Sequence, residues 1–190
     1  MRITGGASRG RIISGPQGLE ARPTASKIRQ AFFNILSSRI RAARVLDLCA
    51  GTGLMGIEAL SRGASEVIFV EESRRLARSI EQNLQRLGYE AEVICGDVRK
   101  VMPALEPDRF DIVFADPPYK SRLALTIVRE VARNHLLAPD GVLAVEHARG
   151  ADLSYEEAGL YLYDRREYGQ TCVSFYRRRH EHGPDSAALT

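Results

Sequence analysis

The stretch RVLDLCAGTGLMG, residues 44–56, decides the fold of this chain. It opens with a short apolar run that is typical of a buried strand, and it continues into a glycine-rich turn that begins an apolar helix. A buried strand, a glycine turn and a helix in this order form the first unit of a parallel sheet with helices on its faces. The stretch therefore predicts an α/β domain in which strands and helices alternate.

The alternation continues through the rest of the sequence. Helices are expected at residues 54–62 and 73–87, each followed by a glycine, and another is expected to end near Leu137 before a turn at Pro139-Asp140-Gly141. Only Gly169-Gln170 separates the last two strands, which predicts an antiparallel hairpin. The expected strands are residues 45–48, 67–70, 91–95, 111–115, 142–146, 161–168 and 172–177.

An extension precedes this core. Residues 25–41 have apolar side chains at helical spacing, with Thr24 as a candidate N-cap, and residues 1–13 suggest a small hairpin around Gly5-Gly6. We expect one domain, residues 1–179, that consists of the extension 1–43 and the core 44–179, followed by a disordered tail at 180–190.

Length and composition narrow the class of protein. A chain of 190 residues suits one α/β domain. No run approaches the roughly 18 apolar residues of a membrane span, and the first residues do not resemble a signal peptide. We therefore expect a monomeric cytoplasmic protein without membrane contact. Because Cys49, Cys95 and Cys172 lie far apart and outside any CxxC pair, we expect reduced core cysteines and no metal site.

Positive charge gathers near the N-terminus. Residues 1–44 contain nine of the 27 lysines and arginines but only one acid, Glu20, whereas the net charge of the whole chain is +3. A local basic cluster suggests a polyanionic partner, although such charges can also serve solubility alone. The candidate RNA-contacting residues are Arg9, Arg11, Arg22, Thr24, Lys27 and Arg29.

The glycine turn is a candidate cofactor loop. Gly51, Gly53 and Gly56 form a GxGxxG pattern, and Glu71 closes the second strand twenty positions after Gly51. These features suit NAD and S-adenosylmethionine alike. Asp47, directly ahead of the loop, favours the second, because a carboxylate repels a pyrophosphate but attracts a sulfonium and an ammonium.

Further candidates surround this loop. Asp97 closes the third strand, where it could accept a hydrogen bond from an adenine amine or act as an ordinary loop cap. The full set of candidate cofactor-binding residues is Asp47, Ala50, Gly51, Thr52, Gly53, Glu71, Glu72, Asp97, Val98 and Asp116.

Asp116-Pro117-Pro118-Tyr119, directly after the fourth strand, is the most specific motif in the chain. The prolines fix an extended backbone whose carbonyls stay available as acceptors. A rigid loop would explain the prolines but not the acid and the aromatic ring beside them. The lone pair of a base amine is delocalised into the ring, and the Asp116 carboxylate and the Pro117 carbonyl can accept its two hydrogens and orient that lone pair. Tyr119 offers a stacking face for the base, so all four residues are candidate catalytic residues.

With DLCAGTG, FVEES, GDV and DPPY in order, and RPT followed by KIRQAFFNIL upstream, residues 1–178 resemble the bacterial small-subunit (16S) rRNA guanine-N2 methyltransferase family (RsmD). The resemblance implies a class I methyltransferase Rossmann-like fold. Such a fold has a seven-stranded, mostly parallel sheet in the order 3-2-1-4-5-7-6, with strand 7 antiparallel and helices on both faces. It also implies S-adenosylmethionine as cofactor and, as substrate, a guanosine of small-subunit rRNA in an assembling ribosomal particle.

Three alternatives stay open at this point. DPPY also occurs in adenine-N6 and cytosine-N4 methyltransferases, so the target could be another base of RNA or DNA. An NAD-dependent oxidoreductase and a non-catalytic RNA-binding module with this fold are less favoured, because Asp47 and DPPY suit neither.

Overall fold

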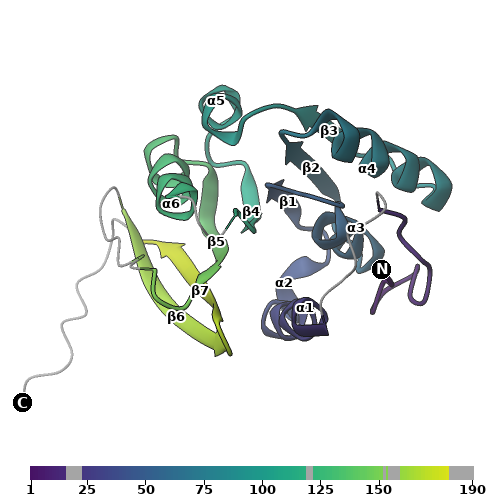
Figure 1. The fold of residues 1–190 in the computed structure, drawn as a ribbon. Helices are drawn as coiled ribbons and strands as arrows, with labels where there is room; N and C mark the ends of the chain where they lie inside the picture. Colours follow the sequence, from purple (N-terminus) through teal and green to yellow (C-terminus); the bar gives the residue numbers. More distant parts are fainter. Residues whose placement is uncertain (16–22, 119–121, 152, 154–158, 180–190) are drawn as a thin grey trace, which may run out of the picture.

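The computed structural model describes residues 1–15, 23–118, 122–151, 153 and 159–179, and for residues 23–27 it describes the backbone alone. Figure 1 shows a central twisted sheet with helices on both faces and the N-terminal segment beside one end of the sheet. The helices are α1 (Pro23–Ile35), α2 (Ser37–Ile40), α3 (Leu54–Ser61), α4 (Arg74–Leu87), α5 (Val98–Val101), η1 (Met102–Ala104) and α6 (Leu123–Arg133).

The sheet has the strand order β3-β2-β1-β4-β5-β7-β6. Strands β1 to β5 run parallel, and β7 pairs antiparallel with both β5 and β6. This confirms the expected fold and its order. The strands are β1 (Arg44–Leu48), β2 (Glu66–Glu71), β3 (Glu92–Cys95), β4 (Phe110–Ala115), β5 (Leu137–Ala148), β6 (Leu160–Tyr168) and β7 (Thr171–Arg178).

Two apolar cores lie on opposite faces of the sheet. Successive side chains of a strand point to opposite faces, and in β1 Val45 joins one core whereas Leu46 joins the other. The first core contains α1 to α4, and the second contains α5 and α6. The cofactor loop and the basic extension therefore belong to the same face of the sheet.

The extension pairs with itself and packs on the core. Arg2 and Ile12 form an antiparallel bridge, and the Ile3 amide donates to the Arg11 carbonyl at 3.0 Å, as a hairpin over residues 1–13 requires. Ile3 and Ile13 are fully buried in the first core. The hairpin is thus anchored by apolar side chains and not by pairing alone.

Two helix ends follow the predicted signals. Ser73 caps α4 by accepting a hydrogen bond from the Leu76 amide at 3.4 Å, and Gly88 has the left-handed φ of +75° that glycine adopts most easily. In contrast, the single helix expected at residues 25–41 is divided into α1 and α2 at Leu36, and α1 already begins at Pro23. Thr24 therefore lies inside α1, and its predicted role as N-cap is wrong.

The turn predicted at Pro139-Asp140-Gly141 is also wrong. α6 ends at Arg133, and β5 already begins at Leu137, so these three residues lie within the strand. The pairing of β4 with β5 shifts between Phe110 and Ile112, which makes room for the extra residues as a bulge. A bulge tolerates proline and glycine inside a strand, and this explains why a turn-like composition misled the prediction.

The cysteines differ in their surroundings. Cys172 is buried, Cys49 is half-buried and Cys95 is exposed. The prediction of a core position was therefore wrong for Cys95.

Candidate active site

The candidate residues meet where the direction of the sheet reverses. From β1 the chain proceeds outward through β2 and β3, and it then returns to β4 on the other side of β1. In open α/β sheets, ligands bind beyond the carboxyl ends of the strands at such a switch point. Asp47 lies in β1, Glu71 ends β2, and Asp116 directly follows β4, so the three acids share this edge.

Backbone geometry explains the glycines of the loop. Gly51 and Gly53 have φ angles of +58° and +73°, which other residues rarely adopt. A Cβ atom on Gly53 would also lie 2.9 Å from Cγ1 of Ile80 in α4. The loop thus depends on glycine for its backbone conformation and for its packing against α4.

Asp47 fixes the start of α3. Its side chain is buried, and one carboxylate oxygen accepts a hydrogen bond from the Gly56 amide at 2.9 Å. Burial raises the pKa of Asp47 to about 8, although the hydrogen bond from Gly56 lowers it, and the charges of Asp116 and Glu71 raise it further. Asp47 therefore holds the start of α3 through its hydrogen bond with the Gly56 amide.

Glu71 connects the two loops that follow β1 and β2. One carboxylate oxygen accepts the Gly51 amide at 2.7 Å, and the other accepts the Ser73 amide at 2.8 Å. Each oxygen has a second lone pair, so the carboxylate can accept further hydrogen bonds. This geometry is compatible with the ribose contact predicted for Glu71 and adds a role in holding the loop.

Four carboxylates act on one thiol at the centre of this edge. Burial and, second, the charges of Glu71, Asp47, Asp116 and Glu72 raise the pKa of Cys49 to about 12. The loop therefore lies in a negative field. Such a field opposes a pyrophosphate and attracts a cationic ligand.

Asp97 is engaged by its neighbours. Its side chain caps α5 by accepting from the Arg99 amide at 2.9 Å, and it also forms an ion pair with the Arg99 guanidinium. The hydrogen bonds from Arg99 lower the pKa of Asp97 to about 2. Val98 begins α5 and is buried. An adenine contact by Asp97 would therefore have to share the carboxylate with Arg99.

Thr52 and Ala50 contact segments outside the loop. The Thr52 hydroxyl lies 3.7 Å from the sulfur of Met1, and Ala50 donates its amide to the carbonyl of Val70 in β2 at 3.0 Å. The exposed Glu72 follows β2, and its carbonyl accepts a hydrogen bond from the thiol of Cys95. Both ends of the loop are thus attached to neighbouring segments.

Asp116 lies beside an acid that the sequence did not reveal. Ala115 at the end of β4 is paired with Val145 of β5, so the next residues, Asp116 and Glu146, are neighbours on adjacent parallel strands. The Asp116 side chain reaches solvent. Partial loss of its hydration and, second, the charge of Glu146 nevertheless raise the pKa of Asp116 to about 7. The two residues are close because β4 and β5, which are distant in the sequence, pair in this register, and sequence spacing alone did not show it.

The rest of the DPPY motif is only partly described. Pro117 is buried and Pro118 is exposed, as expected for a stiff loop that leaves the sheet edge. Tyr119 lies outside the described residues, so its stacking role stays a prediction.

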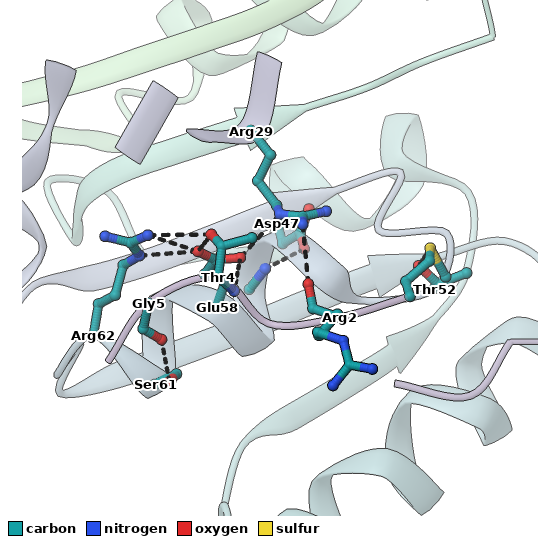
Figure 2. A network of polar contacts seen from close by, with 11 residues as sticks. Arg2, Thr4, Gly5, Arg29, Asp47, Thr52, Glu58, Ser61 and Arg62 are labelled. Atoms are coloured by element: carbon teal, nitrogen blue, oxygen red, sulfur yellow. Dashed lines mark hydrogen bonds and ion pairs between the residues drawn. The ribbon is translucent and has the colours of Figure 1, made fainter. Parts of the chain in front are cut away.

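A buried ion-pair network lies beside α3, the helix that follows the candidate cofactor loop. Figure 2 shows Glu58 of α3 between Arg29 of α1, Arg62 and Thr4. The Arg29 Nε atom lies 2.9 Å from Glu58 Oε2, the Arg62 Nη2 atom lies 2.7 Å from Glu58 Oε1, and the Thr4 amide donates to Glu58 at 3.3 Å. Arg29 also donates to the Arg2 carbonyl at 3.0 Å. The network joins the hairpin and α1 to the helix that begins at the cofactor loop.

The predicted RNA-contacting residues occupy different environments. Arg9 is exposed, whereas Arg11 is exposed but donates to the Arg86 carbonyl at 2.9 Å. Arg29 is only 5% exposed and pairs with Glu58, so we leave it out of the surface available to phosphates. Arg22 and the side chains of Thr24 and Lys27 lie outside the described residues.

The described part of the chain contains no group of three or more His, Cys, Asp or Glu side chains that could hold a metal ion. None of its helices is both long and apolar enough to span a membrane.

Comparison with known proteins places this geometry in a family. The family model described as conserved hypothetical protein 95 matches residues 1–177. The ribosomal RNA small subunit methyltransferase D of Escherichia coli (strain K12) is 31% identical over 179 residues, which cover 94% of this chain and 90% of that protein. The protein of the same name from Haemophilus influenzae is 35% identical over 151 residues, which cover 77% of this chain and 78% of that protein.

Solved structures agree with these relatives. The protein yhhF from Escherichia coli superposes with a TM-score of 0.85 at 32% identity, covering 94% of this chain and 98% of that chain. A hypothetical protein from Thermus thermophilus superposes with a TM-score of 0.78 at 30% identity, covering 93% and 99%. The family resemblance of the motifs is confirmed, and the chain belongs to the family of conserved hypothetical protein 95, among whose relatives are the ribosomal RNA small subunit methyltransferases D.

Proposed function

We propose that this protein is an S-adenosylmethionine-dependent methyltransferase that methylates the exocyclic N2 amine of a guanosine in small-subunit (16S) rRNA. One observation carries the proposal: Asp116 and Pro117 follow β4 at the switch point, beside a glycine loop surrounded by carboxylates. The names of the relatives from Escherichia coli and Haemophilus influenzae support rRNA as the substrate class.

The loop suits a cationic cofactor without phosphates. S-adenosylmethionine carries a sulfonium and an ammonium, and both gain from the acidic side chains of Asp47, Glu71, Glu72 and Asp116 around the loop. The same side chains disfavour NAD because of its pyrophosphate. When bound, S-adenosylmethionine supplies an electrophilic methyl group.

Each part of the edge would bind one part of this cofactor. We assign the backbone of residues 50–53 and the carboxylate of Asp47 to the methionine portion, and Glu71 and Glu72 to the ribose hydroxyls. Asp97 and the Val98 backbone are assigned to the adenine. These assignments follow the order of the strand ends along the sheet.

Asp116 and Pro117 act on the base. The Asp116 carboxylate and the Pro117 carbonyl accept the two hydrogens of the exocyclic amine and so orient its lone pair for attack. The ionised form of Asp116 is required for this role, because a protonated carboxyl would offer a competing donor. With a pKa of about 7, Asp116 changes its charge near neutral pH.

Incubation of the protein with labelled S-adenosylmethionine and small-subunit rRNA tests the proposal. The expected product after digestion to nucleosides is N2-methylguanosine, identified by mass spectrometry. N6-methyladenosine or N4-methylcytidine would instead identify another target base, and transfer to no RNA would overturn the assignment.

The form of the substrate is tested in the same assay. We propose that a monomer of the protein acts on rRNA within an assembling particle. Methylation of the particle should then exceed methylation of the same rRNA free of protein, and equal rates would contradict this part of the proposal.

A further inference from the structure

Helix α4 has a basic face of exposed arginines. Its apolar side buries Ile80 and Leu84 in the first core. Arg74, Arg75 and Arg78 lie within about 100° of one another on the opposite side, because residues of a helix advance about 100° each. All three are exposed, and within the described ranges none of their side chains has an ion-pair or hydrogen-bond partner.

Stability does not account for these charges. Cations in the first turn of a helix oppose the positive end of the helix dipole, and α4 has no acid in that turn. Arg74 and Arg78 are also four positions apart, where like charges repel. The helix dipole therefore does not explain three arginines at this end of α4, which favours a role in binding.

The N-terminal segment extends the same face. The Ser14 amide donates to the Asn83 side chain at 3.1 Å, and Asn83 donates back to the Ser14 carbonyl at 2.8 Å. Arg86 donates to the carbonyl of Ile12 at 2.6 Å. Residues 12–14 thus lie along α4, and Arg86 and Arg11 are used in holding them there.

Arg9 adds one more exposed charge near the far end of α4. It is exposed at the tip of the hairpin, next to Ser8, whose hydroxyl lies 2.7 Å from the Tyr89 hydroxyl beyond the end of α4. Within the described ranges Arg9 has no ion-pair or hydrogen-bond partner through its side chain. We call Arg9, Arg74, Arg75 and Arg78 the α4 arginine surface.

This surface leads to the candidate active site. α4 begins one residue after Ser73, whose amide is held by Glu71, and Glu71 also holds Gly51 of the cofactor loop. A helix of 14 residues is about 20 Å long, so the surface reaches from the loop past several nucleotides of a bound strand.

We propose that the α4 arginine surface binds the phosphate backbone of the substrate RNA and leads the strand toward Asp116. The identity of the RNA rests on the proposed function, whereas the surface itself rests on exposure, charge and contacts. Unpaired arginines suit phosphates because each guanidinium can donate two parallel hydrogen bonds.

The test compares three variants in binding to a small-subunit rRNA fragment over a salt series. The first replaces Arg74, Arg75 and Arg78 with Gln, and the second replaces the same residues with Lys. The control replaces Arg133, Arg149 and Arg166 with Gln, which removes equal charge from exposed residues at the other end of the sheet.

The Gln variant should lower the slope of log affinity against log salt by about 2, at about 0.7 for each lost phosphate contact with a single strand. Between about 50 and 200 mM salt, the affinity of the wild type should then fall about 20-fold more than that of the variant. The Lys variant should keep most of the slope because it keeps the charge, and the control should keep all of it.

Two results would overturn the inference. One is a Gln variant whose slope equals that of the control. The other is a Gln variant that unfolds at lower urea than the wild type, since the arginines would then serve the fold. Methyl transfer by the wild type is measured separately, so a failure of the proposed function is distinguished from a failure of this surface.

Discussion

Removal of Arg29 tests whether the buried network around Glu58 holds the N-terminal extension on α3. Arg29 and Glu58 are 5% and 0% exposed, and their charged atoms lie 2.9 Å apart. Loss of one partner from a buried pair costs about 3–5 kcal/mol, because the other charge stays buried without its partner. Glu58 keeps Arg62 and Thr4 as partners, so we expect about 3 kcal/mol for Arg29→Met, in which Met fills most of the space.

Urea denaturation measures this loss. The matched control is Arg9→Met, which removes an exposed arginine from the same extension and should change the free energy of unfolding by less than about 0.5 kcal/mol. Arg29→Met combined with Glu58→Gln should cost less than the sum of the single changes, by at least about 1 kcal/mol. An Arg29→Met variant as stable as the Arg9→Met control would refute the structural role of the network.

Three further predictions concern the site itself. The kcat/KM for methyl transfer should rise about tenfold from pH 6 to pH 8 as Asp116 ionises with its pKa of about 7, and a flat pH profile would contradict this role. Gly53→Ala should cost about 1–2 kcal/mol of stability because of its φ of +73° and its approach to Ile80, whereas Gly10→Ala, with open space around it, controls for the positive φ alone. Asp47 has a pKa of about 8 when folded and about 4 when unfolded, so between these pH values the native state binds more protons than the unfolded state. The free energy of unfolding should therefore fall as pH rises from 5 to 8. Asp47→Asn should make this fall smaller, as measured by denaturation at pH 5 and pH 8.

Local signals explain the parts of the fold that the sequence predicted. The Ser73 cap, the Gly88 end of α4 and the glycine loop depend on neighbouring residues, so their sequence pattern is sufficient. The strand order came from the family resemblance and was confirmed by the sheet. The bulge in β5 depends on pairing with β4, and Pro139 and Gly141 therefore suggested a turn instead.

Tertiary contacts explain what the sequence did not reveal at the site. The burial of Arg29 arises because the hairpin and α3 cover one side of α1, and no pattern within residues 25–41 indicates that cover. The proximity of Glu146 to Asp116 depends on the register of β4 and β5. Glu58 did offer a signal, because an acid within the otherwise apolar segment 54–61 needs a buried cation as its partner.

The central claim is methyl transfer to a guanine amine that Asp116 and Pro117 orient. The most direct measurement compares the wild type with Asp116→Ala, using nucleoside mass spectrometry of small-subunit rRNA and calorimetry of S-adenosylmethionine binding. We expect N2-methylguanosine from the wild type, almost none from Asp116→Ala, and cofactor affinities within a few-fold of each other. An active Asp116→Ala variant, or a wild type that leaves the rRNA unmethylated, would contradict the claim.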